Sequence, residues 1–405
     1  MRIPFASQIR GRMFTRRGLL AKATIMLAAG VHPCDAQSRC DPDAAFRSVQ
    51  ILLANKQYEQ AAKTLDGLRP CATLSNLQRF QMGWLYGRAR RFDVALEVFA
   101  KVPEDVPDRQ SHGYAVALAR FEQTDFRGAI STLTALRAAG FSDPNSTNLL
   151  AVAYARSGLY REAYQVLSNA VAAAPDDLTT WMNLVTVCAE GGDFAKSAEV
   201  AEKAAQLFPR ESEVFVVRGA ANMLLGRVDK AAEDFAIATR LAPARADARF
   251  FLALTKYQRG DLADAVQILR AAAKEGIADS DLHYLTAECL LKMDPANTAP
   301  PLKELKRAIA LNLASVPARI LRGKLLLEAG RAGDAVQDLE IARKTSPDSR
   351  SATYNLARAY RALGRTSDAQ KLLSGLQAQS EKALLDEISQ QRLGGAVMGR
   401  GDPTK

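Results

Sequence analysis

The stretch PNSTNLLAVAYARSGLYREAYQVLSNAVAAAP, residues 144–175, decides the fold because its pattern recurs along the chain about every 34 residues. Within it, Leu150 and Tyr154 lie four residues apart, on one face of an expected first helix. Gly158 follows, where a left-handed backbone would end that helix. Small residues recur on an expected second helix, which Pro175 ends. The stretch therefore predicts two antiparallel helices joined by a tight turn.

Three columns of residues keep this register through the chain. A small residue stands where the second helix crosses the first at close range, and this column holds Ala61, Ala95, Ala129, Ala163, Ser197, Ala231, Ala265, Ala335 and Ala369. The second column holds Gly158, Gly192, Gly226, Gly260, Gly330 and Gly364, and the third Pro175, Pro209, Pro243 and Pro347. The first three repeats have Lys56, Arg90 and Thr124 in place of the glycine.

These columns together resemble the tetratricopeptide repeat. The resemblance covers essentially the whole chain after the N-terminal segment and implies an all-α, right-handed α-solenoid of about ten helix-turn-helix repeats. Repeats one to seven are expected over residues 42–276 and repeats eight to ten over residues 280–376. Apolar residues at helical spacing then predict a capping helix over residues 377–393, followed by a flexible tail over residues 394–405.

The eighth repeat carries a two-residue insertion and three prolines, Pro295, Pro300 and Pro301. Pro301 stands in the column of small residues, so the second helix of this repeat is expected to begin near it. The insertion is either a longer surface loop or a bend that divides the solenoid into two stiff parts.

Residues 1–36 have the composition of a secretory signal peptide. A basic first part precedes an apolar run from Gly18 to Val31, and Ala36 ends the segment on a small residue. The run is shorter than a bilayer span, so cleavage after Ala36 is preferred to a permanent anchor, and membrane contact is expected only if the signal stays uncleaved. Arg16 and Arg17 leave the twin-arginine and the general export routes both open. The expected location is periplasmic or secreted.

Composition and charge fit packed helices without a nucleic-acid partner. The chain is 48% hydrophobic and only 7% aromatic, with a formal net charge of +10. Six basic residues and one acidic residue fall before residue 37 and account for half of that net charge. No run of Lys or Arg follows, so binding to nucleic acid is not indicated.

The cysteines also favour an exported chain. Cys40 precedes the first helix of the first repeat and Cys71 follows the second, so an antiparallel pair would bring both to the same end. A disulfide there would clip a terminal repeat that lacks one neighbour, and the alternative is two unrelated thiols. Cys188 and Cys289 fall inside first helices of distant repeats and are interpreted as buried small hydrophobic residues.

No catalytic, metal or cofactor site is indicated. His112 and His283 stand five repeats apart, and neither has a second histidine or cysteine at ligand spacing. There is no phosphate loop, and Gly191 with Gly192 belongs to the glycine column. The carboxylate pair Asp176 and Asp177 follows a helix-ending proline and is interpreted as a cap of the next helix.

A binding surface is implied instead by the resemblance, because first helices of tetratricopeptide arrays line a concave groove. Carried onto this sequence, the lining positions select Phe80, Trp84, Tyr114, Phe121, Arg156, Met182, Phe250, Tyr257, Tyr284, Lys324, Tyr354 and Arg358. Aromatic residues suit an extended peptide or a helix, although several could simply fill the inside of a tight superhelix. The family's carboxylate clamp is absent, since Val152, Glu213 and Val217 stand where it needs amide or basic groups.

The sequence thus predicts an exported, non-catalytic scaffold that holds one or more protein partners in its groove. An envelope assembly or secretion factor docked on membrane proteins is the first alternative. An enzyme with its activity in the groove is the second, and the mostly apolar lining speaks against it.

Overall fold

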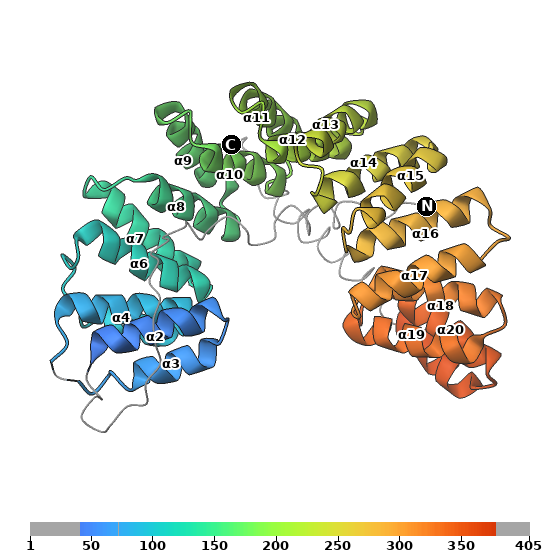
Figure 1. Cartoon of the computed structure of the whole chain (residues 1–405), viewed down its shortest axis with the longest axis horizontal. Coiled ribbons are helices and arrows are strands. Elements are labelled where there is room, and N and C mark those ends of the chain that lie inside the picture. Colours follow the sequence, from blue (N-terminus) through green and yellow to red (C-terminus); the bar gives the residue numbers. More distant parts are fainter. Residues whose placement is uncertain (1–40, 72, 378–405) are drawn as a thin grey trace, which may run out of the picture. The chain divides into compact units, whose positions relative to one another are not determined.

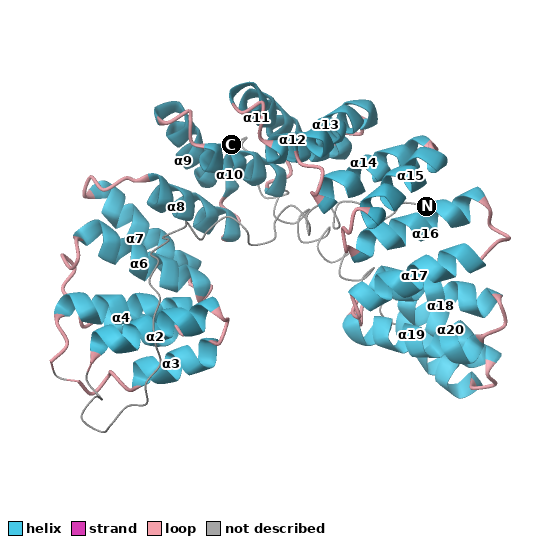
Figure 2. Ribbon diagram, in the orientation of Figure 1, coloured by secondary structure: helices cyan, strands magenta, loops and turns pink. Residues whose placement is uncertain are grey.

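The computed structural model describes residues 41–71 and 73–377 of the 405-residue chain. All regular elements in these residues are helices (Figures 1 and 2), so the all-α prediction is confirmed. The expected signal peptide, Cys40, the flexible tail and all but the first residue of the expected capping helix lie outside the described residues.

The helices follow one another as first and second members of successive repeats. In chain order they are α2 (Pro42–Ala54), α3 (Tyr58–Asp66), α4 (Asn76–Arg88), α5 (Phe92–Phe99), α6 (Arg109–Glu122), α7 (Phe126–Ala138), α8 (Pro144–Arg156), α9 (Tyr160–Ala173), α10 (Leu178–Glu190), α11 (Phe194–Leu207), α12 (Ser212–Leu224), α13 (Val228–Leu241), α14 (Ala246–Arg259), α15 (Leu262–Lys274), α16 (Ser280–Met293), α17 (Ala299–Leu311), α18 (Val316–Glu328), α19 (Ala332–Thr345) and α20 (Arg350–Ala362).

The chain forms two compact units that divide between Arg227 and Val228, inside the sixth repeat. The insertion of the eighth repeat lies inside the second unit. Across that insertion α16 and α17 remain closely packed. The helix α17 begins at Ala299 with prolines in its first turn, and Pro301 is buried, as the sequence predicted for this repeat.

Each unit has an inner and an outer layer of helices. In the first unit α2, α4, α6, α8, α10 and α12 contact one another in succession, and in the second α14 contacts α16 and α18 contacts α20. Within each unit the second helices pack between the first helices of their own and the following repeat, and α13, which begins the second unit, packs on α14. Helices that touch directly lie on the shorter side of a curved stack, so the first helices form the inner layer of each unit.

Short polar residues start many of the helices. Asp143 accepts hydrogen bonds from the backbone N–H groups of Asn145 and Ser146 at the start of α8, where Pro144 occupies the first turn. Asp177 accepts one from the backbone of Thr179 at the start of α10, which confirms its interpretation as a cap. These contacts satisfy backbone donors that a helix cannot satisfy internally.

The glycine column marks left-handed turns, and the turn persists where glycine is lost. The backbone angle φ of Gly158 is 77°, and φ is also positive at the other five glycines of the column. At the corresponding positions of the first three repeats Lys56, Arg90 and Thr124 have φ of 59°, 62° and 65°. The turn geometry is therefore set by packing of the two helices, and a residue with a side chain adopts it at a conformational cost.

The column of small residues lies where the helices cross. Every member of this column is buried, with an exposed fraction of 0% or 1%. Ser197 fits because its hydroxyl donates to the carbonyl oxygen of Val185 over 3.0 Å. The buried polar atom thus has a partner, which removes most of its desolvation cost.

Two arginines take the place of a tryptophan at the start of first helices. Trp181 Nε1 donates to the carbonyl oxygen of Pro175 over 2.9 Å. Arg249 Nε donates to Pro243 over 2.7 Å and Arg319 Nε to Leu313 over 2.8 Å, so both reach a carbonyl six residues upstream, as the indole does. A planar N–H group on a long side chain is the shared requirement.

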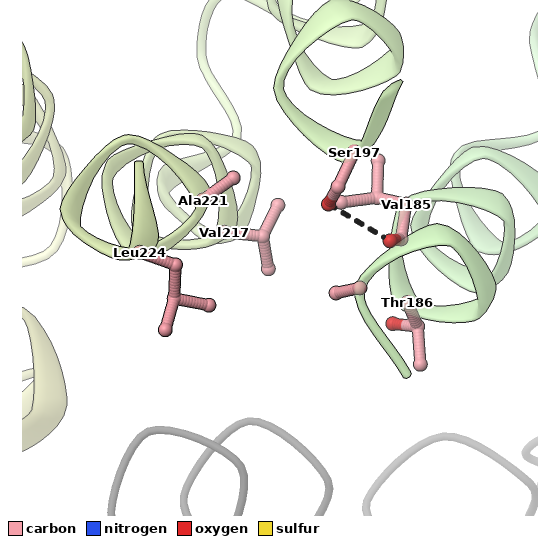
Figure 3. A pocket seen from close by; sticks show the side chains of 7 residues that line it. Val185, Thr186, Ser197, Val217, Ala221 and Leu224 are labelled. Atoms are coloured by element: carbon pink, nitrogen blue, oxygen red, sulfur yellow. Dashed lines mark hydrogen bonds between the residues drawn. The ribbon is translucent and has the colours of Figure 1, made fainter. Parts of the chain in front are cut away.

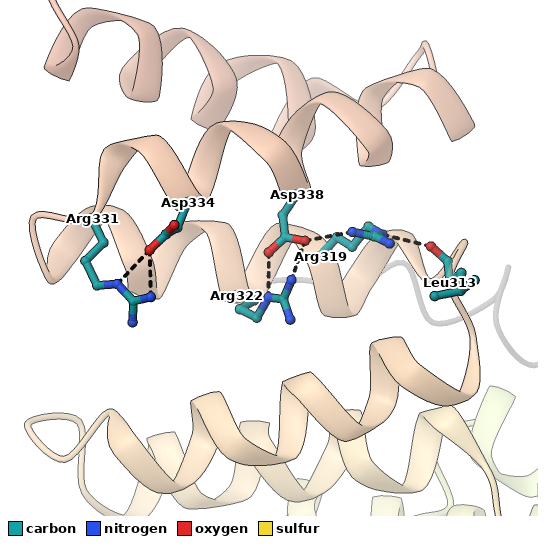
Figure 4. A network of polar contacts seen from close by, with 6 residues as sticks. All are labelled: Leu313, Arg319, Arg322, Arg331, Asp334 and Asp338. Carbon is teal, nitrogen blue, oxygen red and sulfur yellow. Dashed lines mark hydrogen bonds and ion pairs between the residues drawn. The ribbon is translucent and has the colours of Figure 1, made fainter.

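Each of these arginines also brings a buried charge that needs a partner. Arg249 pairs with Glu275, and Arg319 pairs with Asp338 over 2.7 Å. Asp338, whose side chain is 1% exposed, is held from the other side by Arg322 (Figure 4). The network ties α18 to α19.

Candidate functional site

The predicted groove residues differ in how much surface they offer. Trp84, Arg156, Tyr354 and Arg358 are exposed; Phe80, Tyr114, Phe121, Met182, Tyr257, Tyr284 and Lys324 are half-buried; Phe250 is buried. All of them stand on first helices, in the inner layer of one unit or the other.

An aromatic group covers the inner layer at the start of the first unit. The Trp84 and Tyr114 ring centroids lie 6.5 Å apart, which joins α4 to α6. Phe80 lies 5.5 Å from Phe99 and 6.2 Å from His112, measured between ring centroids, and so roots the group in the core. Trp84 remains 38% exposed, so its indole has a free face for another molecule.

Two of the predicted groove aromatics are directed into the protein. Phe121 packs on Phe126 of the second helix in its own repeat, with ring centroids 5.3 Å apart. Phe250 is 5% exposed and packs edge-on against Phe251 at 5.5 Å. The structure therefore places Phe250 in the core, where it offers almost no surface to a partner.

A compact polar and aromatic cluster lies on α14 and α16 in the second unit. Tyr284 donates from its hydroxyl to Glu288 over 2.8 Å, and Lys292 Nζ lies 4.5 Å from the Tyr257 ring centroid. Burial raises the pKa of both tyrosines, and the charge of Glu288 raises it further. Both phenols therefore stay protonated and act as hydrogen-bond donors with apolar faces.

Cations and an exposed tyrosine follow at the last two first helices. Tyr354 is 54% exposed on α20, and Arg358 lies four residues further, on the same face. Lys324 on α18 is 3.9 Å from Glu328, a distant pairing for an ammonium. This end of the inner layer is therefore basic as well as aromatic.

A hydrogen-bond relay between α8 and α10 was missed by the sequence reasoning. Asn183 Nδ2 donates to Asn148 Oδ1 over 2.8 Å, and Asn148 Nδ2 donates to Thr180 Oγ1 over 2.9 Å. The relay occupies amides that could otherwise contact a ligand. The sequence does show an asparagine at similar places in two successive first helices, Asn148 and Asn183. The repeat period alone does not indicate which groups these amides contact.

A shallow cleft lies between α10 and α12 in the first unit, beside one of the crossing points. Its volume is only about 10 Å³, and it is lined mainly by Val185, Val217, Ala221 and Leu224, with Thr186 at its edge (Figure 3). The lining is apolar, because the one serine in it, Ser197, directs its hydroxyl to the Val185 carbonyl. A cleft of this volume has room for about one water-sized group, so it offers no deep pocket for a ligand.

The cysteines divide into two kinds. Cys71 is buried and disulfide-bonded, and because its predicted partner Cys40 lies outside the described residues, that pairing stays a prediction. Cys188 and Cys289 are free and buried, as expected. Burial raises the pKa of Cys188 to about 11 and that of Cys289 to about 12, so neither thiol forms the reactive thiolate near neutral pH.

The two histidines have ordinary structural contacts. His112 is buried with Nε2 3.2 Å from the Phe99 carbonyl oxygen, and His283 Nδ1 lies 2.7 Å from Glu304. Over residues 41–71 and 73–377 no three His, Cys, Asp or Glu side chains gather in a way that could hold a metal ion. In the same part of the chain no helix has both the length and the hydropathy needed to cross a membrane.

An inner layer of first helices with half-exposed aromatic residues defines a helical repeat scaffold for protein interactions. Profiles of the tetratricopeptide repeat match residues 114–177, 148–212 and 221–281, and residues 326–387. The chain belongs to the tetratricopeptide repeat family, whose members bind protein partners and are generally non-catalytic.

Three similar proteins illustrate how much of this chain and of its relatives is matched. Human tetratricopeptide repeat protein 7B is 28% identical over 143 residues, 33% of this chain and 17% of that protein. A tetratricopeptide repeat protein from Parabacteroides merdae is 18% identical with a TM-score of 0.49, covering 62% of this chain and 98% of the other. Yeast Tom70 is 16% identical with a TM-score of 0.41, covering 87% and 96%.

Proposed function

We propose that this protein is an exported, non-catalytic scaffold that binds peptide or helical segments of protein partners along its first helices. The observation that carries this proposal is the presence of partly exposed aromatic residues on the inner layer of each unit, Trp84 and Tyr114 in the first and Tyr257, Tyr284 and Tyr354 in the second. Aromatic rings give a large contact area at a low entropy cost.

The exposed rings offer enough surface to contribute to binding. Trp84 and Tyr354 are 38% and 54% exposed, so a partner can cover a large part of each ring. Covering that area would contribute about 2 kcal/mol for each ring before the ordering cost of binding is subtracted. Several such anchors, spread over successive repeats, are needed for a stable complex.

Export is supported by two features at the N-terminal end. Residues 1–36 have the composition of a signal peptide, and Cys71 is in a disulfide. Disulfides persist in oxidising compartments and are rare in the cytosol of most organisms. With cleavage after Ala36 the mature chain keeps Cys40 as the one cysteine besides Cys71, Cys188 and Cys289, and the last two are free.

Absence of catalysis is supported by the state of the nucleophiles near the inner layer. Burial holds the thiols of Cys188 and Cys289 protonated, and the half-buried tyrosines keep their protons as well. A catalytic nucleophile needs the opposite shift or an adjacent base.

The test is to recover the tagged full chain from its native host after chemical cross-linking. We expect the protein in the exported fraction, a Cys40–Cys71 peptide without reductant, and partner cross-links on first helices. Recovery only from the cytosol would refute export, and contacts confined to second helices would refute the groove. Cross-links to membrane proteins through an uncleaved N-terminus would favour the envelope assembly factor.

The groove itself is tested by Tyr257→Ala combined with Tyr284→Ala. We expect weaker binding to the partner identified by cross-linking, because two anchors on α14 and α16 are lost, while circular dichroism keeps the same helicity. The matched control is Tyr160→Ala with Tyr164→Ala, which removes two half-buried tyrosines from the second helix α9. Unchanged affinity in the first pair, or an equal loss in the control, would refute the groove.

A further inference from the structure

The inner layer of the second unit changes its charge along one column of corresponding positions. Leu254, Glu288, Lys324 and Arg358 occupy this column on α14, α16, α18 and α20. Leu254 is buried, Glu288 and Lys324 are half-buried, and Arg358 is exposed. The accessible part of the column therefore changes from acidic at Glu288 to basic at Lys324 and Arg358 within three repeats.

Two cations of the last described first helix, Arg358 and Arg361, have no carboxylate partner among the described residues, whereas Lys324 on α18 is paired loosely with Glu328. Among the described residues Arg358 has one hydrogen bond, from Nη1 to Asn355 Oδ1 over 3.3 Å, and neither it nor Arg361 forms an ion pair. Nearby arginines behave differently, since Arg322 pairs with Asp338 and Arg365 with Asp368. Within the described residues, Arg358 and Arg361 are thus two exposed guanidinium groups without a carboxylate partner.

These cations share a face with an exposed ring. Tyr354, Arg358 and Arg361 are spaced four and three residues apart on α20, so they lie on one side of that helix. Guanidinium groups bind carboxylates through paired hydrogen bonds, and the tyrosine ring adds apolar area beside them. Lys324, Tyr354, Arg358 and Arg361 are together called the basic end.

We propose that the basic end binds an acidic segment of the protein partner, with the following apolar part of that segment lying over Tyr284. This inference rests on the proposed function and specifies the partner's chemistry. Glu288 disfavours a carboxylate beside Tyr284, because like charges repel at close range. The acidic residues of the bound segment are therefore expected at the basic end, and its apolar residues beside Tyr284.

A protein segment fits this surface better than a nucleic acid or a membrane. The basic end supplies three cations, while Glu328 on α18 and Glu288 on the preceding first helix α16 limit the positive surface. Proteins that depend on phosphate contacts use about 6–10 of them. Aromatic and apolar residues between the charges match a peptide that alternates in the same way.

The experiment measures binding of fluorescent peptides to the full chain at low and at physiological salt. One set carries a block of glutamates at one end of an alanine, leucine and tyrosine sequence, and the matched set carries lysines there. The protein variants are Arg358→Glu with Arg361→Glu and, as the control, Lys303→Glu with Lys306→Glu. The control makes the same change of net charge on exposed positions of the second helix α17.

We expect the glutamate peptides to bind at least about tenfold more tightly than the lysine peptides. The preference should be lost or reversed in the arginine variant and kept in the control. Equal binding of both sets, no binding of either, or the same loss in the control would overturn the proposal, as would arginine-dependent binding only to single-stranded DNA or anionic vesicles. Cross-linked partners that bind the arginine variant normally would overturn it while leaving the proposed function intact.

Discussion

Replacing glycine by alanine at three positions should change the free energy of unfolding in different directions. The comparison tests whether backbone conformation or packing decides the role of each glycine. Gly158 has φ of 77°, whereas Gly87 lies in the helix α4 without a positive φ. A Cβ atom added at either position meets nothing within 4 Å. The two substitutions therefore add the same group to open space and differ only in the backbone.

The expected magnitudes follow from that difference. In the left-handed region an alanine costs about 1–2 kcal/mol, and restriction of the unfolded chain returns about 0.4–1 kcal/mol. Gly158→Ala should thus lower the free energy of unfolding by about 0.5–1 kcal/mol. Gly87→Ala should raise it by about 0.5 kcal/mol, because alanine favours a helix and Gly87 lies in the last turn of α4.

Gly83, one turn earlier on α4, adds a packing comparison. A Cβ atom there would come within 2.6 Å of Phe99, whose ring is 2% exposed and cannot move aside freely. Gly83→Ala should therefore destabilise the array by about 1–3 kcal/mol, which is the usual cost of overpacking.

The assay is urea unfolding followed by circular dichroism, combined with hydrogen exchange to locate the affected repeats. Repeat arrays unfold in parts, so exchange at the α8–α9 turn and within α4 gives the local free energies. The expected order of stability is Gly87→Ala, the unchanged chain, Gly158→Ala and Gly83→Ala. A Gly158→Ala protein as stable as Gly87→Ala would refute the reasoning from backbone conformation.

Two further substitutions test the buried ion pairs. Asp338→Asn should lower the free energy of unfolding, measured in urea, by about 3 kcal/mol, because it leaves Arg319 and Arg322 without their buried carboxylate. The control Asp334→Asn removes an exposed partner of Arg331 and should change this free energy by less than about 0.5 kcal/mol. Equal effects of the two substitutions would contradict the role of burial. The hydrogen bond with His283 holds the pKa of Glu304 below its ordinary value, so its stabilising effect is present above that ordinary value and is lost as the pH falls through the lowered pKa. Glu304→Gln should therefore be about 1–2 kcal/mol less stable than the unchanged chain at pH 7. The difference should shrink as the pH falls through the lowered pKa of Glu304, and a difference that stays constant with pH would contradict this assignment.

The repeat pattern predicted the fold because each column answers a local requirement. A crossing of two helices needs a small residue whatever the neighbouring repeats contain, and a tight helix turn needs a left-handed residue. Ala163 and Gly158 meet these requirements at the expected places. Thr124 shows that the turn persists even where the sequence gives no glycine, so the column of small residues was the more dependable indication there.

The contacts between repeats were not predictable in the same way. Arg249 and Arg319 stand where the pattern allows a large aromatic residue, and their role depends on Glu275 and Asp338 being at hand on the following second helix. The amides of Asn148 and Asn183 likewise meet each other across two first helices. Such pairings depend on residues of two different helices. The repeat register assigns a position within one repeat and does not indicate which residues of another helix lie opposite it.

Residues at corresponding positions of the inner layer differ in burial, and the repeat pattern does not predict this difference. Phe250 and Tyr354 occupy the same position of their first helices, yet Phe250 is 5% exposed and Tyr354 is 54% exposed. Phe250 packs on its neighbour Phe251, whereas the residue after Tyr354 is Asn355, which donates to the Ser351 carbonyl. A ring is drawn into the core where an apolar partner adjoins it and stays outside where the adjoining side chain is polar. How much surface a repeat position of the inner layer offers therefore depends on the residue beside it as well as on the repeat residue itself.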